Sequence, residues 1–324
     1  MKNVNYNKIA KKVIETEINS LKKLKLNLNK SFDKAVKTIL GCNNGKIVIS
    51  GVGKSGIIGK KISSTLSSVG TPSFFVDASS CSHGDLGQIG LNDVLILISY
   101  SGESSELKNI IQYAKRNKIS LIGIVSKKKS LLYKLSDVKI LMPEVKEADP
   151  NNLVPTSSTI TQLSIGDALA VATMNSRKFT KLDFKKFHPS GSLGAKLKTV
   201  EDLMLTGNKI PFVKENILME YALRILVKKK LGTLVVKNKK GFTCGILTDG
   251  DIKRSSQKID NIKSIKINKI MKKNPISVNK ETLAAEALSI MNLKKVTSLC
   301  VYDKNKKKTI GIIHIHNILQ SNIS

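Results

Sequence analysis

Residues 94–103 of the 324-residue chain read VLILISYSGE, five apolar residues followed by small hydroxyl side chains and a glycine. A continuous apolar run of this length is typical of a strand buried on both faces, as strands of parallel sheets are. The same pattern stands upstream, where KIVIS at residues 46–50 runs into GVGKSG at residues 51–56. Each stretch is followed by a segment with helical periodicity. Both therefore predict strand–loop–helix units of an α/β fold.

Three further apolar runs continue this pattern, at residues 73–76, 120–125 and 138–142. Helix-like segments separate most of them, and a long helix is expected over residues 161–176. Apolar strands that alternate with helices predict a parallel sheet covered on both faces. We expect a doubly wound, five-stranded parallel sheet.

A second pattern begins near Thr199, where two copies of one segment follow each other. GILTDGDI at residues 245–252 aligns with GIIHIHNI at residues 311–318, and TLVV at 233–236 aligns with SLCV at 298–301. Because several elements recur in the same order, two copies of one α/β unit are predicted. The expected domains are residues 1–198, 199–258 and 265–324.

The formal net charge of +31 comes from 55 basic residues against 24 acidic ones. Few of the basic residues are arginine, the side chain that best reads phosphates bidentately. The lysines are spread along the whole chain, so no specific nucleic-acid partner is expected. The four cysteines stand far apart without a CxxC pair, and no metal site is expected.

No stretch approaches the roughly 20 apolar residues that a membrane-spanning helix needs, so no membrane partner is expected. Residues 1–25 are rich in lysine and asparagine, and Ile14, Ile18 and Leu21 share a helical spacing. This segment predicts an amphipathic helix and not a signal peptide. We therefore expect a cytoplasmic protein.

The loop after the third strand carries three hydroxyl groups, those of Ser99, Ser101 and Ser104, beside the start of a helix. Parallel sheets bind ligands at the carboxyl ends of their strands, where helix N-termini offer free N–H groups. Three hydroxyls with such amides suit a phosphate monoester. We call Ser99, Ser101 and Ser104 the cradle. Alternatively, the serines only cap the helix. The GVGKSG loop lacks the spacing of a P-loop, so nucleotide hydrolysis is not expected.

Taken in order, the motifs resemble those of the arabinose 5-phosphate isomerase family over nearly the whole chain. The matching segments are GVGKSGIIGKK, GTPSFFV, HGDLG, SYSGESSE, KEADP, PTSST, GDALAVA, FHPSGSLG and TDGD. The resemblance implies a sugar isomerase (SIS) domain followed by a tandem pair of CBS repeats. It also implies a homotetramer with active sites shared between subunits. Its reaction interconverts D-ribulose 5-phosphate and D-arabinose 5-phosphate, and so supplies Kdo for lipopolysaccharide.

The resemblance further implies roles for individual residues. The implied catalytic residues are Lys54, Glu106, Glu147 and His188. The implied substrate contacts are Ser55, Gly70, Thr71, His83, Ser99, Ser101 and Ser104. Four positions depart from the family pattern: Tyr100 stands where asparagine is usual, Ser190 where glycine is usual, Asp149 where cysteine is common, and Asp77 where some members have a metal-binding histidine.

Aldose–ketose isomerisation moves one proton between adjacent carbons through an enediol. It needs a base for the carbon-bound proton and stabilisation of the developing oxyanion, and it requires no cofactor. Glu147 is the expected base, with Glu106 as its rival. We expect His188 to open the sugar ring or to shuttle the hydroxyl proton, and Lys54 to stabilise the enediolate.

In CBS repeats, the hydroxyl and carboxylate of a G-x-x-[ST]-x-x-D pattern can hold an adenosyl ligand. The first repeat supplies Thr248 and Asp251, whereas the second has His314 and Asn317 at these positions. The pair is therefore expected to bind one adenine nucleotide effector or to be purely structural.

Two alternatives stay open for the function. The chain could be an isomerase for another phosphosugar, or a non-catalytic sensor of sugar phosphates. A sensor needs only the phosphate cradle, so the presence of Glu106, Glu147 and His188 favours catalysis.

Overall fold

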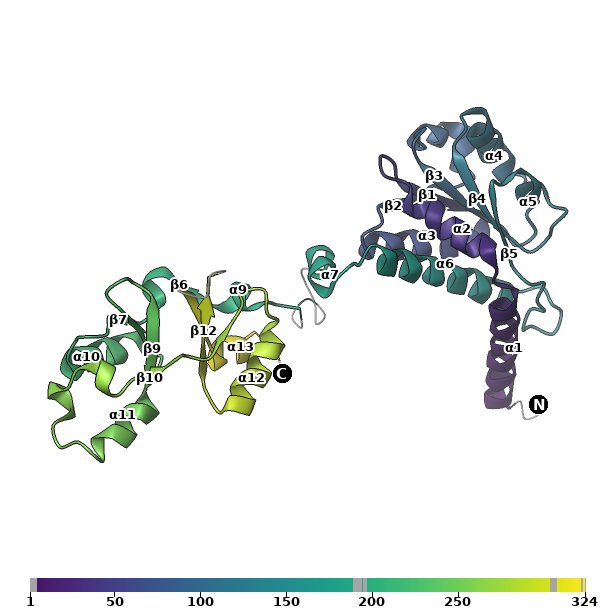
Figure 1. The fold of residues 1–324 in the computed structure, drawn as a ribbon. Coiled ribbons are helices and arrows are strands. Elements are labelled where there is room, and N and C mark those ends of the chain that lie inside the picture. The colour runs from purple at the N-terminus through teal and green to yellow at the C-terminus, as the bar shows by residue number, and fades with distance from the viewer. Residues whose placement is uncertain (1–4, 189–193, 195–196, 304–307, 322, 324) are drawn as a thin grey trace. The chain divides into compact units, whose positions relative to one another are not determined.

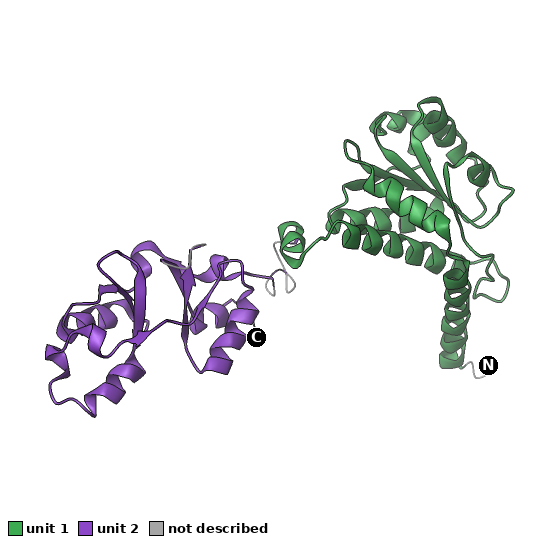
Figure 2. Cartoon of the chain, viewed as in Figure 1, with its two compact units in different colours: residues 1–187 green, residues 188–324 purple. Residues whose placement is uncertain are grey.

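The structure is a computed structural model that describes residues 5–188, 194, 197–303, 308–321 and 323. The chain forms two compact units, residues 1–187 and residues 188–324, drawn in green and purple in Figure 2. Each unit has a hydrophobic core of its own, and each is described separately below.

The first unit alternates strands and helices along the chain (Figure 1). Its strands are β1 (Ile47–Gly51), β2 (Ser73–Phe75), β3 (Val94–Ile98), β4 (Ser120–Val125) and β5 (Val138–Leu141). Its α-helices are α1 (Tyr6–Asn27), α2 (Lys30–Leu40), α3 (Gly53–Ser68), α4 (Leu107–Arg116), α5 (Leu131–Leu135), α6 (Ser157–Ser176) and α7 (Lys181–Phe187). Two short 3-10 helices, η1 (Ser80–His83) and η2 (Asp85–Gln88), follow β2.

The five strands form one sheet in the order β2-β1-β3-β4-β5, and every neighbouring pair is parallel. Side chains alternate between the two faces of a strand. Ile96 and Ile98 of β3 pack in a cluster with α2, α3 and α6, whereas Leu95 and Leu97 pack with α4 and α5. Helices therefore cover both faces, and the predicted doubly wound sheet is confirmed.

Helix α1 confirms the expected N-terminal helix but buries little of its apolar face. Leu24 is its one buried apolar side chain among the described residues. Ile14 and Ile18, which share the apolar spacing, are 55% and 40% exposed. Figure 1 shows the N-terminal part of α1 extending away from the sheet.

The second unit contains the two repeats. The first comprises β7 (Phe212–Lys214), α10 (Met219–Lys229), β8 (Thr233–Lys237), β9 (Thr243–Thr248) and α11 (Asp249–Ser256). The second comprises β11 (Ser277–Val278), α12 (Ala284–Lys294), β12 (Ser298–Tyr302), β13 (Thr309–His314) and α13 (Ile315–Leu319). The segments before the repeats contribute α9 (Val200–Leu203), β6 (Leu205–Thr206), η3 (Gly207–Lys209), η4 (Ile262–Ser264), η5 (Ile267–Lys269) and β10 (Lys272–Lys273).

Each repeat has a four-stranded sheet, and the two sheets exchange their outer strands. The orders are β10-β9-β8-β7 and β11-β12-β13-β6. Strand β6 precedes the first repeat but pairs with β13 of the second, and β10 precedes the second repeat but pairs with β9 of the first. The predicted pair of α/β repeats is therefore present, and its two copies are interlocked.

Candidate functional site

Lys54 and Ser55 lie in the first turn of α3, directly after β1 and at the carboxyl edge of the sheet. Gly53 adopts a positive φ of 57°, which a side chain would disfavour. A Cβ on Gly56 would lie 2.7 Å from the carbonyl oxygen of Gly51, so the helix approaches the strand closely here. The Lys54 side chain is exposed and Ser55 is half-buried. This geometry presents the ammonium group and the first amides of α3 together.

The loop after β3 forms the expected arrangement of hydroxyls. Ser99 is 4% exposed, and its Oγ lies 3.1 Å from Ser104 Oγ and accepts a hydrogen bond from the Gly102 N–H. Ser101 Oγ accepts from the N–H of Glu103. Ser99 therefore shapes the turn, while the half-buried Ser101 and Ser104 stand nearer the surface.

Glu147 is held at the N-terminus of α6. Its Oε2 accepts hydrogen bonds from the Thr156 N–H at 2.8 Å, the Thr156 hydroxyl at 3.0 Å and the Ser158 N–H at 3.2 Å. Burial works to raise the pKa of this carboxyl, but the hydrogen bonds from Ser158 and Thr156 outweigh it and hold the pKa below its ordinary value. Glu147 is therefore ionised at neutral pH.

The segment that carries Glu147 is organised by two other side chains. Tyr100 Oη accepts a hydrogen bond from the Val145 N–H at 2.7 Å and donates one to the Val145 carbonyl at 3.2 Å. The carboxylate of Asp149 accepts three backbone N–H bonds, from residues 151, 153 and 154. Tyr100 and Asp149, two of the departures from the family pattern, thus both hold the segment that carries Glu147 in place.

These elements enclose a pocket of about 360 Å³ in the first unit. Its lining includes Lys54, Ser55, Tyr100 and Glu147, together with Asn152, Leu153, Pro155, Ser158 and Thr159. Two implied catalytic residues, Lys54 and Glu147, thus share one pocket. A cation and a carboxylate in such a position can stabilise an oxyanion and accept a proton.

Glu106 and His83 lie at the same edge of the sheet but do not line this pocket. Glu106 stands at the N-cap of α4 and accepts a hydrogen bond from the Ser105 hydroxyl. His83 ends η1, where it is exposed, and the neighbouring Ser82 accepts a hydrogen bond from Asn109 of α4. Glu106 follows Ser104 by two residues in the chain.

Gly70 and Thr71 do not join the other implied substrate contacts within this chain. They directly precede β2, which places them at the amino edge of the parallel sheet, whereas the cradle follows the carboxyl ends. Thr71 is 1% exposed, and a Cβ on Gly70 would lie 2.6 Å from the ring of Phe179. Gly70 therefore packs against Phe179, and the predicted substrate contacts of Gly70 and Thr71 stay predictions.

His188 is the first residue of the second unit, so its role is carried by the resemblance alone. Residues 189–193 of the FHPSGSLG motif lie outside the described residues. Sequence reasoning also left Asn152 without a role. Its Oδ1 accepts a hydrogen bond from the Glu147 N–H, and it has a positive φ of 59°. Asparagine in a loop is a common signal for this conformation.

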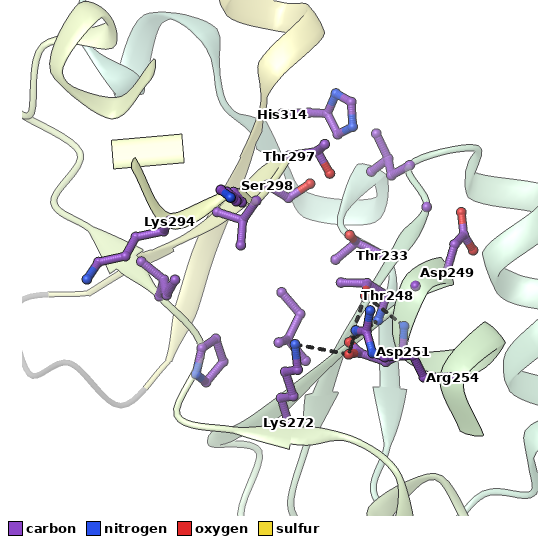
Figure 3. A pocket seen from close by; sticks show the side chains of 18 of the residues that line it. Thr233, Thr248, Asp249, Asp251, Arg254, Lys272, Lys294, Thr297, Ser298 and His314 are labelled. Carbon is purple, nitrogen blue, oxygen red and sulfur yellow. Dashed lines mark hydrogen bonds and ion pairs between the residues drawn. The ribbon is translucent and has the colours of Figure 1, made fainter. Parts of the chain in front are cut away.

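The second unit contains a larger cavity, of about 750 Å³, which residues of both repeats line (Figure 3). Thr248 and Asp251 lie here as expected, but they bind each other: Thr248 Oγ1 donates to Asp251 Oδ2 at 2.7 Å, forming a capping box for α11. Arg254 and Lys272 pair with the other oxygen of Asp251. Both residues thus line the cavity and are also bonded to protein groups, and their role as nucleotide contacts stays a prediction.

The sequence predicted neither a metal site nor a membrane-spanning helix. Within the described part of the chain, no cluster of three or more His, Cys, Asp or Glu side chains is placed to hold a metal ion. No helix among the described residues is long and apolar enough to span a bilayer.

Comparison with known families defines the class of the protein. Residues 39–172 match the SIS domain, and residues 200–258 and 267–323 each match the CBS domain. The parallel sheet with its cradle is therefore an SIS domain, and the interlocked repeats are a CBS pair.

Full-length relatives narrow the class to one family. Arabinose 5-phosphate isomerase KdsD of Francisella tularensis is 42% identical over 96% of this chain and 95% of its own length. KdsD of Escherichia coli K12 is 39% identical over 98% of this chain and 96% of its own length. The chain belongs to the arabinose 5-phosphate isomerase family, as the motifs predicted.

Solved structures agree for the first unit. A protein of E. coli CFT073 in complex with arabinose 5-phosphate superposes with a TM-score of 0.56 at 36% identity, covering 58% of this chain and all of that one. A phosphosugar isomerase from Bacteroides fragilis, described as involved in capsule formation, gives a TM-score of 0.54 at 32% identity over 57% of this chain and 97% of that one.

Loss of the Tyr100 hydroxyl should impair turnover. We expect Tyr100→Phe to lower kcat by about tenfold with a smaller change in KM, because misplacing a catalytic group by a fraction of an ångström is costly. Steady-state kinetics with D-arabinose 5-phosphate measures this. Tyr113→Phe is the matched control, since Tyr113 donates to the Ile89 carbonyl away from the pocket. Equal kcat in the two variants would contradict a positioning role for Tyr100.

Proposed function

We propose that this protein interconverts D-ribulose 5-phosphate and D-arabinose 5-phosphate through an enediol intermediate. The observation that carries the proposal is the pocket that Lys54 and Glu147 share with Tyr100, the residue between Ser99 and Ser101. The reaction needs one group of each kind, a cation for the oxyanion and a carboxylate for the carbon-bound proton. The names of the full-length relatives, and the complex of the E. coli protein with arabinose 5-phosphate, support the same sugar.

In the proposed mechanism Glu147 is the base. Its three hydrogen bonds all fall on Oε2, which fixes the carboxylate, and Oε1 takes the proton from the carbon and returns it to the adjacent one. The Lys54 ammonium stabilises the enediolate oxygen. The substrate phosphate binds at Ser101 and Ser104 of the cradle, together with Ser55.

The remaining implied residues act around this pair. Glu106 is the rival base, and its place at the start of α4 beside the cradle supports a role near the phosphate or the hydroxyl groups. His188 opens the sugar ring or shuttles the hydroxyl proton. In this proposal His83 also contacts the substrate.

The product class supports a role in Kdo supply for lipopolysaccharide in the cytoplasm. The four cysteines are all free, which agrees with a reducing compartment. No cofactor enters the mechanism, since both proton transfers are made by side chains. Turnover measured with and without a chelator tests whether a metal ion is needed, and we expect equal rates.

Incubation of the purified protein with D-ribulose 5-phosphate, without added metal or nucleotide, tests the reaction. We expect NMR to show D-arabinose 5-phosphate accumulating to an equilibrium mixture. Formation of a different aldose phosphate would support an isomerase that acts on another sugar. If D-ribulose 5-phosphate stays unchanged but still protects the protein against thermal unfolding, the protein is a sugar-phosphate sensor and not an enzyme.

The active form is proposed to be a homotetramer that buries the apolar face of α1. Tyr6, Ile9 and Ile14 of this helix are 76%, 53% and 55% exposed in the single chain, which supports a partner surface there. Light scattering on the purified protein measures the subunit number, and a monomer would refute this assembly.

The CBS pair is proposed to hold an adenine nucleotide effector. The cavity of about 750 Å³ between the repeats supports this, since its volume suits a mononucleotide. Titration calorimetry with AMP and ATP tests it, and the absence of heat with both would leave the pair a structural element.

A further inference from the structure

Two hydrogen bonds join the loop after β3 to the start of α5. Strands β3 and β4 are parallel neighbours, so the loops that follow them meet at the carboxyl edge of the sheet (Figure 1). The Leu131 N–H donates to Glu103 Oε1 at 2.9 Å, and the Leu132 N–H donates to the Gly102 carbonyl at 3.2 Å. The Glu103 carboxylate therefore caps α5, although the residue itself lies in the loop that carries the cradle.

These two bonds complete the N-terminus of α5. The first N–H groups of a helix have no partner within the helix and need one elsewhere. Leu131 and Leu132 have theirs in the loop after β3. The Tyr133 N–H donates to the Ser130 hydroxyl at 3.3 Å, and helical bonding begins with the Lys134 N–H. The first amides of α5 are thus all bonded to protein groups, and the loop after β3 supplies two of the acceptors.

The backbone of Glu103 is bonded to the cradle. Its N–H donates to Ser101 Oγ at 3.3 Å. Beside it, the Gly102 N–H donates to Ser99 Oγ, which lies 3.1 Å from Ser104 Oγ. Because the Ser101 oxygen accepts a hydrogen bond, its own hydrogen is available to donate to a phosphate oxygen. Glu103 thus connects a hydroxyl of the cradle to the helix on which the loop rests.

The negative charge of Glu103 works against phosphate binding, since the residue lies two positions from Ser101 and like charges repel. The hydrogen bond from Leu131 offsets this cost, because a carboxylate is favoured at the N-terminus of a helix. The loop therefore requires the acceptor oxygen of residue 103 and not its charge.

We propose that Glu103 is a positioning residue whose carboxylate fixes the loop after β3 on α5 and so holds the Ser101 hydroxyl where it binds the substrate phosphate. This inference rests on the proposed function, in which the cradle binds the phosphate of the sugar. Glu103 takes no proton and contacts no reacting atom. Its loss should weaken substrate binding more than turnover, because the phosphate is held alike in the ground state and the transition state.

Steady-state kinetics of the full chain with D-arabinose 5-phosphate tests the inference. We expect Glu103→Ala to raise KM by roughly tenfold and to change kcat by less than about threefold. Glu103→Gln should give the KM of the unaltered protein or a lower one. Its amide oxygen can still accept the Leu131 N–H, and the repelling charge is gone.

Asp93→Ala is the matched control. The Asp93 carboxylate also accepts backbone N–H bonds, from Lys46 and Gly90, both at 2.7 Å. Asp93 directly precedes β3, however, and so lies at the amino edge of the sheet, opposite the cradle. This variant should lower the melting temperature at least as much as Glu103→Ala and leave KM unchanged. An equal rise of KM in both variants would show a general loosening of the domain and overturn the inference.

The outcomes separate this inference from the proposed function. An unchanged KM in Glu103→Ala, or a raised KM in Glu103→Gln, would overturn the role of Glu103 and leave the reaction intact. If the unaltered protein binds D-arabinose 5-phosphate in calorimetric titration without converting it, and Glu103→Ala binds it roughly tenfold more weakly, the inference stands and the enzyme does not. Absence of both turnover and binding in the unaltered protein would overturn both.

Discussion

Replacing Glu147 by glutamine is expected to lower kcat by about 10²–10⁴-fold, the usual contribution of a positioned general base. Glutamine keeps the size of the side chain and can still accept the hydrogen bonds from Thr156 and Ser158 through its amide oxygen. It cannot take a proton from carbon. Kinetics with D-arabinose 5-phosphate, followed by release of D-ribulose 5-phosphate, measures the effect.

Glu106→Gln is the comparison that assigns the base. Glu106 lies outside the pocket that Glu147 shares with Lys54, so its loss should reduce kcat less. Near-normal turnover in Glu147→Gln, together with a large loss in Glu106→Gln, would exchange their roles.

Because hydrogen bonds lower the pKa of Glu147, activity should also persist as the pH falls to the ordinary glutamate range.

A methyl group on Gly102 should strongly destabilise the first unit. Gly102 has a φ of 69°, and an added Cβ would collide with Ser130 Oγ and lie 2.5 Å from Val125 Cγ2. The left-handed backbone costs an alanine about 1–2 kcal/mol, and overpacking adds about 1–3 kcal/mol. We expect Gly102→Ala to lower the free energy of unfolding by roughly the sum, measured from hydrogen exchange of the β3 and β4 amides.

Gly207→Ala is its control. Gly207 has a similar φ of 56°, but a Cβ there has no neighbour within 4 Å among the described residues. It should show only the backbone cost, seen in the exchange of the β8 and β12 amides. If Gly102→Ala costs no more than Gly207→Ala, the close contact with Ser130 does not exist in solution.

The fold was predictable because its signals are local. Five apolar runs such as VLILI can be buried only in a sheet covered on both faces, and all five strands are present. The repeats were visible because their elements recur in order. The exchange of β6 and β10 was not predictable, since these strands have two residues each and pair with distant segments.

The site was predictable in part. The position of Ser99, Ser101 and Ser104 follows from where a strand ends, and no tertiary information is needed. The hydrogen bonds of Tyr100 to Val145 depend on how β3 lies relative to the segment after β5, so they could not be predicted from the sequence. The motifs alone also could not place Gly70 and Thr71 at the amino edge.

The exchange of outer strands has a consequence during synthesis. Strand β6 leaves the ribosome before either repeat, yet its partner β13 is the last strand of the second repeat. Pairing over such a sequence separation is slow, and the exposed edge must stay unpaired until β13 has been translated. A ribosome that stalls before β13 should therefore release a chain with a folded SIS domain and an incomplete CBS pair, a substrate for quality-control proteases.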